Sequence, residues 1–204
     1  MTLIAVLDYG IGNLRSAQKA LEHVGADARL TADPGLVRDA AAVVLPGVGA
    51  FGRCMEAIRA AGIDDLAHEA VASGRPFIGI CVGMQLLYEA SEESPGAAGL
   101  GILAGTVRWL PDTVKRPQMQ WNTLDITAPS PLFAGLDDPA WVYFVHSYAA
   151  EDSGLTVATC DYGGPVTAAV QRDNVYATQF HPEKSGRTGL ALLANFVDLA
   201  ANAS

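Results

Sequence analysis

Short apolar runs alternate with helical patterns in the first half of the chain. The runs Leu3 to Leu7, Ala41 to Leu45 and Pro76 to Ile80 are bounded by turn residues, and each predicts a buried strand. Helical spacing of apolar residues predicts helices over 14–24, 54–61, 64–72 and 82–90. Strands that alternate with helices predict a parallel sheet that is covered by helices on both faces.

The second half of the chain has a different pattern. Short segments rich in β-branched and aromatic residues are separated by turn residues, which predicts strands near 104–110, 122–127, 141–146, 155–160, 166–171 and 175–180. A closing helix is predicted over 189–200, where Leu190, Leu193 and Phe196 recur at helical spacing. Because neither a repeat nor a linker interrupts these patterns, a single domain is expected over 1–204.

Composition excludes several classes of function. A net charge of -9 without a basic cluster predicts no nucleic-acid binding. The apolar runs are too short to span a bilayer, and the first residues lack the basic region of a signal peptide. The three cysteines are widely spaced and odd in number, which predicts no disulfide framework and a reducing, cytoplasmic location. The four histidines lack ligand spacing, so neither a metal nor a cofactor is expected.

Cys81 lies between two glycines, in the segment Gly79-Ile80-Cys81-Val82-Gly83, where a predicted strand gives way to a predicted helix. A nucleophile at such a turn is held in a strained position, and the amides at the helix start favour a thiolate. The amide of Val82 could also contribute to an oxyanion hole. An alternative interpretation is that Cys81 is a small buried hydrophobe, as most free cysteines are.

Two further segments follow predicted strands. His181-Pro182-Glu183 comes after the last strand and offers a base with an adjacent carboxylate that could orient it. Because parallel strands end at one edge of a sheet, we expect His181 to lie near Cys81. The segment 46–49, Pro-Gly-Val-Gly, also follows a strand, and its glycines would let an amide turn towards an oxyanion. A satisfied polar histidine and a plain turn are the alternative interpretations.

Together these three segments resemble the class I, triad-type glutamine amidotransferases. Other segments are similar to the branch of that family that serves histidine biosynthesis, and they occur at 8–14, 45–51, 119–122, 144–148 and 179–185. The resemblance covers nearly the whole chain. It implies an α/β, flavodoxin-like fold with a mostly parallel sheet flanked by helices and extra antiparallel strands in the second half. Val82 replaces the usual leucine, and Gln120 replaces a glycine that could have required an unusual backbone conformation.

The resemblance also implies residue roles. Cys81 would attack the side-chain amide of glutamine, His181 would transfer protons, Glu183 would orient His181, and the amides of Val48 and Val82 would bind the oxyanion. Substrate-binding positions would be Gly47, Gly49, Gln85, Glu93, Tyr143 and Ser147. Interface or gating positions would be Tyr9, Asn13, Trp121 and Lys184.

The resemblance further implies a heterodimer. The partner would be a (β/α)8-barrel cyclase that receives the ammonia and makes imidazole glycerol phosphate and the aminoimidazole carboxamide ribotide. The glutaminase would be nearly silent without that partner's ligand, and we expect the strand at 46–49 to be the switch. Two alternatives are a class I glutaminase of another pathway and a non-enzymatic regulatory relative.

Overall fold

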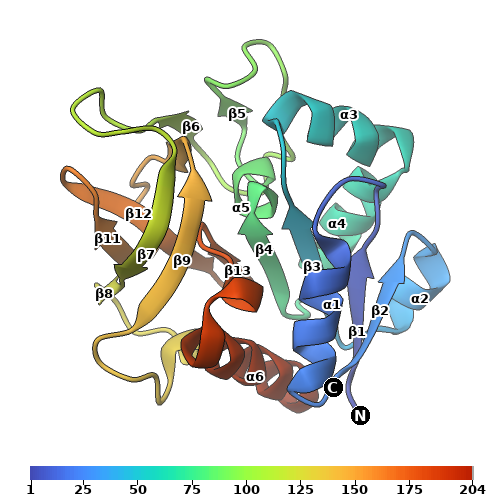
Figure 1. Ribbon diagram of the computed structural model, residues 1–204. Helices are drawn as coiled ribbons and strands as arrows, with labels where there is room; N and C mark the ends of the chain where they lie inside the picture. The colour runs from blue at the N-terminus through green and yellow to red at the C-terminus, as the bar shows by residue number, and fades with distance from the viewer. Residues whose placement is uncertain (204) are drawn as a thin grey trace.

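The computed structural model describes residues 1–203, which form a central sheet of eight strands in the order β2-β1-β3-β4-β13-β12-β11-β8 (Figure 1). The first five strands in this order are parallel, and the last three are antiparallel. Their bounds are β2 (Asp27–Thr31), β1 (Leu3–Leu7), β3 (Ala42–Gly47), β4 (Phe77–Cys81), β13 (Val175–Thr178), β12 (Pro165–Arg172), β11 (Thr156–Asp161) and β8 (Asp125–Ile126).

Helices cover both faces of the parallel half of the sheet, as the alternating pattern predicts (Figure 1). On one face α1 (Leu14–His23) contacts α6 (Gly186–Asn202), and on the other lie α2 (Pro34–Asp39), α3 (Phe51–Ala60) and α4 (Ile63–Ala72). All residues of β3 and β4 are buried between these layers. Within residues 1–203, no helix has the length and apolar character needed to cross a lipid bilayer.

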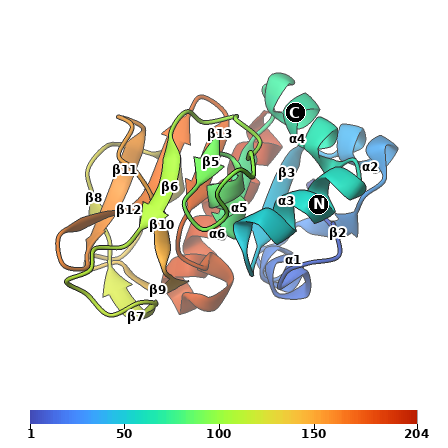
Figure 2. The same ribbon diagram turned by 90° about the horizontal axis from the view of Figure 1, so that it is seen from above.

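Two smaller sheets lie beside the main one. One contains β10 (Tyr148–Ala150), which is antiparallel to β6 (Thr106–Trp109), and β5 (Ala90–Ser91), which is parallel to β6. The other is the antiparallel, hairpin-like pair of β7 (Gln118–Thr123) and β9 (Trp141–His146). Figure 2 looks onto the edge where β3 and β4 end, with the short helix α5 (Val82–Leu86) between the parallel half and the antiparallel strands. The expected α/β fold with an antiparallel extension is therefore confirmed.

Local hydrogen bonds explain where the sequence-based boundaries fail. The helix predicted over 82–90 ends at Leu86, because the Leu86 and Tyr88 carbonyls accept from the amides of Leu100 and Gly101 instead of continuing the helix. Both β2 and α2 were missed. Helix α2 has a recognisable start, since the Asp33 carboxylate accepts from the Leu36 amide at 2.8 Å and a proline follows Asp33.

Glycines bring α5 into direct contact with the backbone of the sheet. A Cβ at Gly83 would overlap the carbonyl oxygen of Leu45, and one at Gly47 would lie 2.7 Å from the amide nitrogen of Gly83. A Cβ at Gly79 would lie 2.8 Å from the Gly83 carbonyl oxygen. The glycines around Cys81 therefore fix how closely the helix after the nucleophile packs on β3 and β4.

Replacing Gly83 with alanine tests this packing. The new methyl group would meet backbone that cannot move alone, so Gly83→Ala should lower the free energy of unfolding by about 3 kcal/mol or more. Gly74→Ala is the control. Gly74 has φ +79 but open space around it, so only backbone strain of about 1–2 kcal/mol is expected. Urea unfolding measures both, and equal losses would contradict the close-packing interpretation.

Candidate active site

Cys81 occupies a strained turn at the carboxyl end of β4. It is the last residue of the strand and the N-cap of α5, with φ 56 and ψ -112. Within residues 1–203, Cys81 and Asp173 are the non-glycine residues with positive φ. Such strain is typical of residues that the surrounding structure holds for a purpose. The side chain is buried but reaches a cavity of about 440 Å³.

His181 leaves the sheet at the same edge. Strand β13 is the parallel neighbour of β4, with Thr178 opposite Ile80, so the residues that follow both strands meet there. His181 and Cys81 both line the cavity. The Nδ1 of His181 lies 2.7 Å from Oε1 of Glu183, and the two side chains are 2% and 3% exposed. The structure thus brings together the three residues that the sequence singled out for catalysis.

The environment of His181 favours its charged form. Burial lowers the pKa of His181, but the interactions with Cys81 and with the Glu183 carboxylate outweigh burial and raise this pKa to about 10. Within residues 1–203, Nε2 of His181 forms no hydrogen bond of standard geometry. A catalytic contact with sulfur often tightens only when substrate binds. The site can therefore hold a proton on the imidazole beside the sulfur.

The β9 strand fixes the turn that carries His181. The His181 amide donates to the Tyr143 carbonyl at 3.0 Å, and the Tyr143 amide donates to Oγ of Ser185 at 3.0 Å. The Ser185 hydroxyl in turn donates to the His181 carbonyl at 2.6 Å. A Cβ at Gly186 would lie 3.8 Å from the ring of Trp121, so the ring covers the end of this turn. The hairpin of β7 and β9 is therefore a support of the catalytic turn.

Two buried side chains donate hydrogen bonds to backbone carbonyls of the segment from Pro46 to Gly49. The Tyr9 hydroxyl donates to the Pro46 carbonyl at 2.8 Å, and the Cys54 thiol donates to the Val48 carbonyl at 3.4 Å. Val48 and Gly49 line the cavity. Tyr9 is only 5% exposed, which places this predicted interface residue behind the segment and not on the surface.

The predicted substrate-binding residues divide into two groups. Four of them line the cavity: Gly49, Gln85, Glu93 and Ser147. The Glu93 carboxylate is not a free loop group, because its Oε2 accepts from the Phe51 amide at the start of α3 at 2.7 Å. Gly47 and Tyr143 do not line the cavity. Gly47 packs against Gly83, and the Tyr143 ring lies 6.1 Å from that of Trp121.

Five lining residues had no role assigned from the sequence: Trp109, Pro117, Val145, His146 and Tyr148. The rings of Trp109 and Tyr148 are 4.2 Å apart, and the Arg116 guanidinium lies 4.6 Å from the Trp109 ring centroid. Trp109, Tyr148 and Pro117 come from β6, β10 and the loop before β7. The family-like segment 144–148 contains Val145, His146 and Tyr148, but only the packing of the small sheets shows that they reach the cavity.

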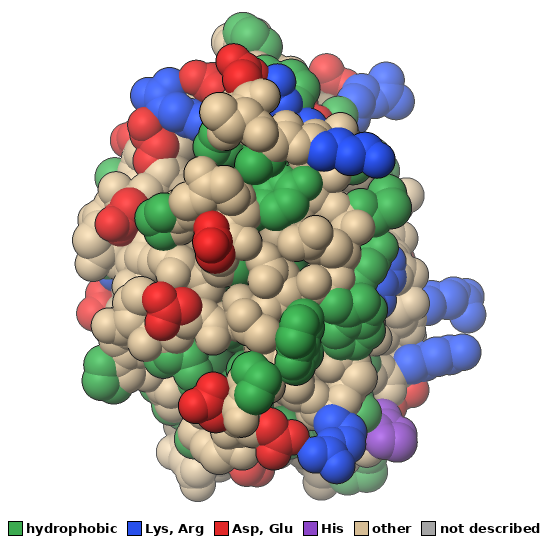
Figure 3. All heavy atoms as spheres, turned by 60° about the vertical axis from the view of Figure 1, so that its left-hand side comes forward, with side chains coloured by type: hydrophobic (Ala, Val, Ile, Leu, Met, Phe, Trp, Pro, Cys, Tyr) green, Lys and Arg blue, Asp and Glu red, His purple; other side chains and the backbone are tan. Residues whose placement is uncertain are grey.

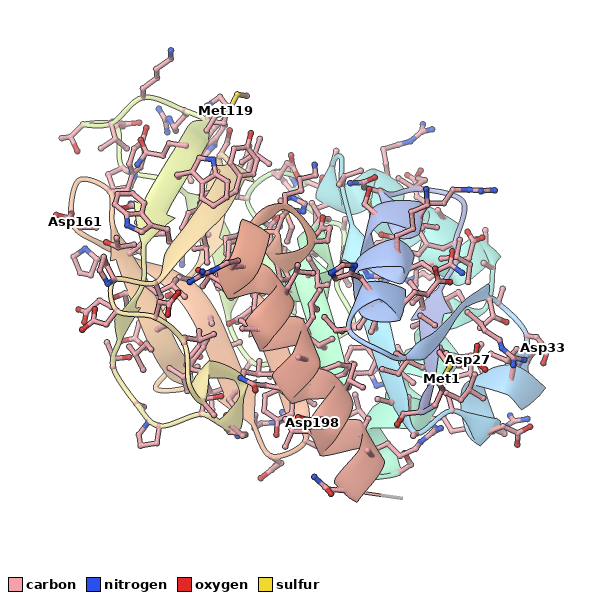
Figure 4. All side chains as sticks on the ribbon, turned by 60° about the horizontal axis from the view of Figure 1, so that its bottom comes forward. Met1, Asp27, Asp33, Met119, Asp161 and Asp198 are labelled. Atoms are coloured by element: carbon pink, nitrogen blue, oxygen red, sulfur yellow. The ribbon has the colours of Figure 1, made fainter. Side chains whose placement is uncertain are left out.

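The predicted interface residues lie around the same edge of the sheet. Lys184 is exposed and lines the cavity. Asn13 is at the N-cap position of α1, where its side chain accepts from the Ser16 hydroxyl at 2.7 Å and not from a backbone amide. Trp121 is 48% exposed and Met119 is 62% exposed. Figure 4 shows Met119 at the outer surface of β7, and Figure 3 shows apolar side chains on the face built by the antiparallel strands.

Gln120, which replaces the usual glycine, leaves the β7 backbone regular. It pairs with Phe144 within an uninterrupted antiparallel ladder, and its φ is not positive. Within the described residues 1–203, Gln120 therefore lies in ordinary strand backbone, and β7 has no conformation there that would require a glycine.

A second histidine, His146, is buried beside the cavity. Its Nδ1 lies 2.8 Å from the Tyr148 carbonyl, and its Nε2 lies 2.9 Å from Oε1 of Gln118. Two acceptors would suit a charged ring, but burial lowers the pKa of His146 to about 4 and outweighs the Tyr148 contact. A neutral ring has a hydrogen-bond partner at both nitrogens if the side-chain amide of Gln118 is flipped. The NH2 group of Gln118 then donates to Nε2 of His146, and its oxygen accepts from the thiol of Cys160.

Comparisons with known proteins agree with this geometry. Residues 5–199 match the family model described as glutamine amidotransferase class-I. The chain is 50% identical to the imidazole glycerol phosphate synthase subunit HisH of Syntrophotalea carbinolica, covering 97% of this chain and 100% of that protein. Identity to the HisH protein of Acinetobacter baylyi is also 50%, with coverages of 97% and 98%.

Solved structures with low sequence identity share the fold. A crystal structure of a glutamine amidotransferase has a TM-score of 0.77 at 22% identity, covering 97% of this chain and 98% of that one. A GMP synthase protein from Thermoplasma acidophilum has a TM-score of 0.75 at 20% identity, with coverages of 99% and 95%. At these identities the likeness supports the fold alone.

The buried neutral His146 predicts a specific loss of stability in acid. In the unfolded chain the group binds a proton below its ordinary pKa of 6.5, whereas the folded protein resists protonation down to about pH 4. Its contribution to stability is thus complete above pH 6.5 and falls as the pH drops towards 4. Between pH 7 and pH 5 the wild type should lose about 2 kcal/mol that His146→Gln does not lose. Urea unfolding at both pH values measures this difference, and parallel pH dependences would show that folding does not lower the pKa of His146.

Proposed function

This chain belongs to the class I glutamine amidotransferases, among the HisH subunits of imidazole glycerol phosphate synthase, and we infer from that membership how its own residues hydrolyse glutamine and deliver ammonia. The observation that carries the assignment of roles is that Cys81 and His181, at the ends of the neighbouring parallel strands β4 and β13, line one cavity, with Glu183 bound to Nδ1 of His181.

In the proposed reaction, glutamine enters the cavity with its side-chain amide beside Cys81. The sulfur attacks the amide carbon while the proton of the thiol resides on His181, which Glu183 holds in place through Nδ1. The developing oxyanion accepts from the amides of Val48 and Val82, at the ends of β3 and β4. Collapse of the tetrahedral intermediate breaks the carbon–nitrogen bond, and the proton on His181 passes to the departing ammonia.

Water completes the cycle. His181 removes a proton from a water molecule, which attacks the glutamyl thioester, and the second tetrahedral intermediate expels the sulfur of Cys81 to give glutamate. Because the Glu183 side chain is only 3% exposed, it keeps the imidazole oriented through both halves of the reaction. Gln85, Glu93, Gly49 and Ser147 are the proposed substrate contacts, since all four line the cavity.

The released ammonia would pass directly to a partner. Ammonia is protonated in bulk water near neutral pH and is then not a nucleophile, so a covered route preserves its reactivity. We propose that the partner is a (β/α)8-barrel cyclase, which uses the ammonia to make imidazole glycerol phosphate and the aminoimidazole carboxamide ribotide of histidine biosynthesis. Met119 and Trp121, with Lys184 nearby at the cavity, form the surface that it would cover.

Two alternative functions have less support. A glutaminase of another pathway would not explain why relatives named HisH are 50% identical over nearly the full length. A non-enzymatic relative would have no need to keep Cys81 in a strained turn beside an oriented and buried His181.

Catalytic substitutions test the assigned roles in the complex with the cyclase and its ligand. Cys81→Ser should abolish glutamine hydrolysis because the nucleophile is replaced by a poor one. Glu183→Gln keeps the shape but weakens the orientation and charge stabilisation of His181, so kcat should fall about 100- to 10,000-fold. Glutamate release measures both. The isolated wild-type chain should turn over far more slowly than the complex, and full activity in isolation would contradict the proposed switch at 46–49.

An exposed tryptophan tests the proposed interface. Trp121→Ala should weaken binding of the cyclase by about 2 kcal/mol, or about 30-fold in Kd, because a large ring at the centre of an interface is a typical hot spot. Ile126→Ala is the matched control, since Ile126 is similarly exposed, at 44%, but lies on the edge strand β8. Calorimetric titration measures both, and equal effects of the two substitutions would rule out the proposed surface.

A further inference from the structure

A buried glutamine, Gln179, lies directly behind the nucleophile. It is fully buried, follows β13, and does not line the cavity, so it is not placed to touch substrate. Its backbone amide donates to the Ala168 carbonyl at 2.8 Å, which anchors it to β12. A polar side chain enclosed in this way requires partners for both ends of its amide.

The two ends of the Gln179 amide meet two residues of the active site. Its Nε2 donates to Sγ of Cys81 at 3.8 Å, and its Oε1 accepts from Nε2 of Gln85 at 3.0 Å. The Gln85 contact determines which way the Gln179 amide faces. Because the oxygen is engaged by Gln85, an N–H must point to the sulfur, where it stabilises the thiolate more than the thiol.

The same contact fixes the amide of Gln85. One N–H of Gln85 donates to Gln179 and the other to the Tyr148 carbonyl at 3.0 Å. Gln85 lines the cavity, and among residues 1–203 no group donates to its Oε1. Its free oxygen is therefore the atom available to a ligand, and it can only accept. A carboxamide NH2 or an ammonium group satisfies that oxygen, whereas a carboxylate does not.

We propose that Gln179 is a positioning residue that stabilises the anionic sulfur of Cys81 and locks Gln85 with its oxygen towards the substrate. This inference rests on the proposed glutaminase function and names a residue that supports it from outside the cavity. One side chain thereby couples the reactivity of the nucleophile to the preference for glutamine over glutamate. The titratable groups that act on Cys81 from neighbouring elements are His181 after β13, Tyr9 after β1 and Cys54 on α3.

The first test measures the reactivity of the sulfur in the complex with the cyclase. The pH dependence of Cys81 alkylation by iodoacetamide, followed by mass spectrometry of the Cys81 peptide, is compared in wild type, Gln179→Met and Gln179→Glu. Gln179→Met cannot donate to the sulfur, so its midpoint should rise by about one pH unit. In Gln179→Glu a protonated carboxyl, favoured by the complete burial of the position, would still donate to the sulfur, so its midpoint should stay closer to that of the wild type.

Gln171→Met is the matched control. Gln171 lies on the adjacent strand β12, and its buried Oε1 has no hydrogen-bond partner among the described residues, so the same substitution removes no comparable contact. Its alkylation midpoint should equal that of the wild type. If Gln179→Met fails to fold, Gln179→Leu, which also lacks a donor, takes its place. A Gln179→Met or Gln179→Leu variant that keeps the wild-type midpoint would overturn the proposal, whether or not it loses thermal stability.

The second test measures substrate discrimination. In Gln179→Met the Gln85 amide keeps only its hydrogen bond to the Tyr148 carbonyl and is held less firmly, so KM for glutamine should rise about 10-fold and inhibition by glutamate should strengthen relative to wild type. In Gln179→Glu the carboxyl group still accepts from Gln85, so KM should stay within about twofold of wild type. Equal KM values in the two variants would contradict the locking role.

The two tests separate this inference from the proposed function. Alkylation does not require glutamine turnover, so it remains informative if the wild-type complex fails to hydrolyse glutamine, an outcome that would refute the proposed function. Normal turnover with an unchanged midpoint in Gln179→Met would refute only the role of Gln179.

Discussion

The parallel pairing of β4 with β13 is the contact on which the site depends. These strands are about 100 residues apart in the sequence, and their register places Ile80 opposite Thr178. The nucleophile directly follows one of these positions, and the base lies three residues beyond the other. Backbone hydrogen bonds between two fully buried strands hold a fixed separation, so the sulfur and the imidazole meet without any direct bond between them in the resting structure.

Close packing then fixes the direction in which Cys81 points. The first turn of α5 lies against β3 through Gly47 and Gly83, where no side chain fits. This contact holds Cys81 in its strained conformation and places the ends of β3 and β4 side by side around the cavity. The catalytic turn is fixed from its other side by β9 through Tyr143 and Ser185. The active site is thus a junction of the parallel sheet and the antiparallel extension.

The antiparallel extension also joins the site to the surface. Trp121 is half exposed on the hairpin, and its ring covers Gly186 at the end of the turn that carries His181. Tyr143, which pairs with Trp121 across the hairpin, holds the backbone of that same turn. A partner that binds over the hairpin would therefore contact the elements that position His181. This arrangement gives a physical reason for a glutaminase whose activity depends on assembly.

The sequence by itself determined the order of strands and helices, the parallel core and the three motif residues Cys81, His181 and Glu183. These features depend on local signals, namely apolar periodicity, glycine punctuation and motif spacing. The sequence-based prediction failed where long-range contacts decide the structure. It missed the early end of α5 and the edge strand β2, and it assigned Tyr143 to the substrate, although Tyr143 lies beside Trp121 and not in the cavity.

Only the tertiary structure revealed how the buried amides and rings are oriented. Gln179 and His146 lie in family-like segments and Trp109 in a predicted strand, but the sequence could assign none of them a role, because their partners come from strands and loops far along the chain. Hydrogen bonds and ring contacts act over a few ångströms, so which groups they join is settled by the packing of the whole domain. The sequence was sufficient to identify the reacting side chains. The surroundings that set their orientation and reactivity depend on three-dimensional contacts.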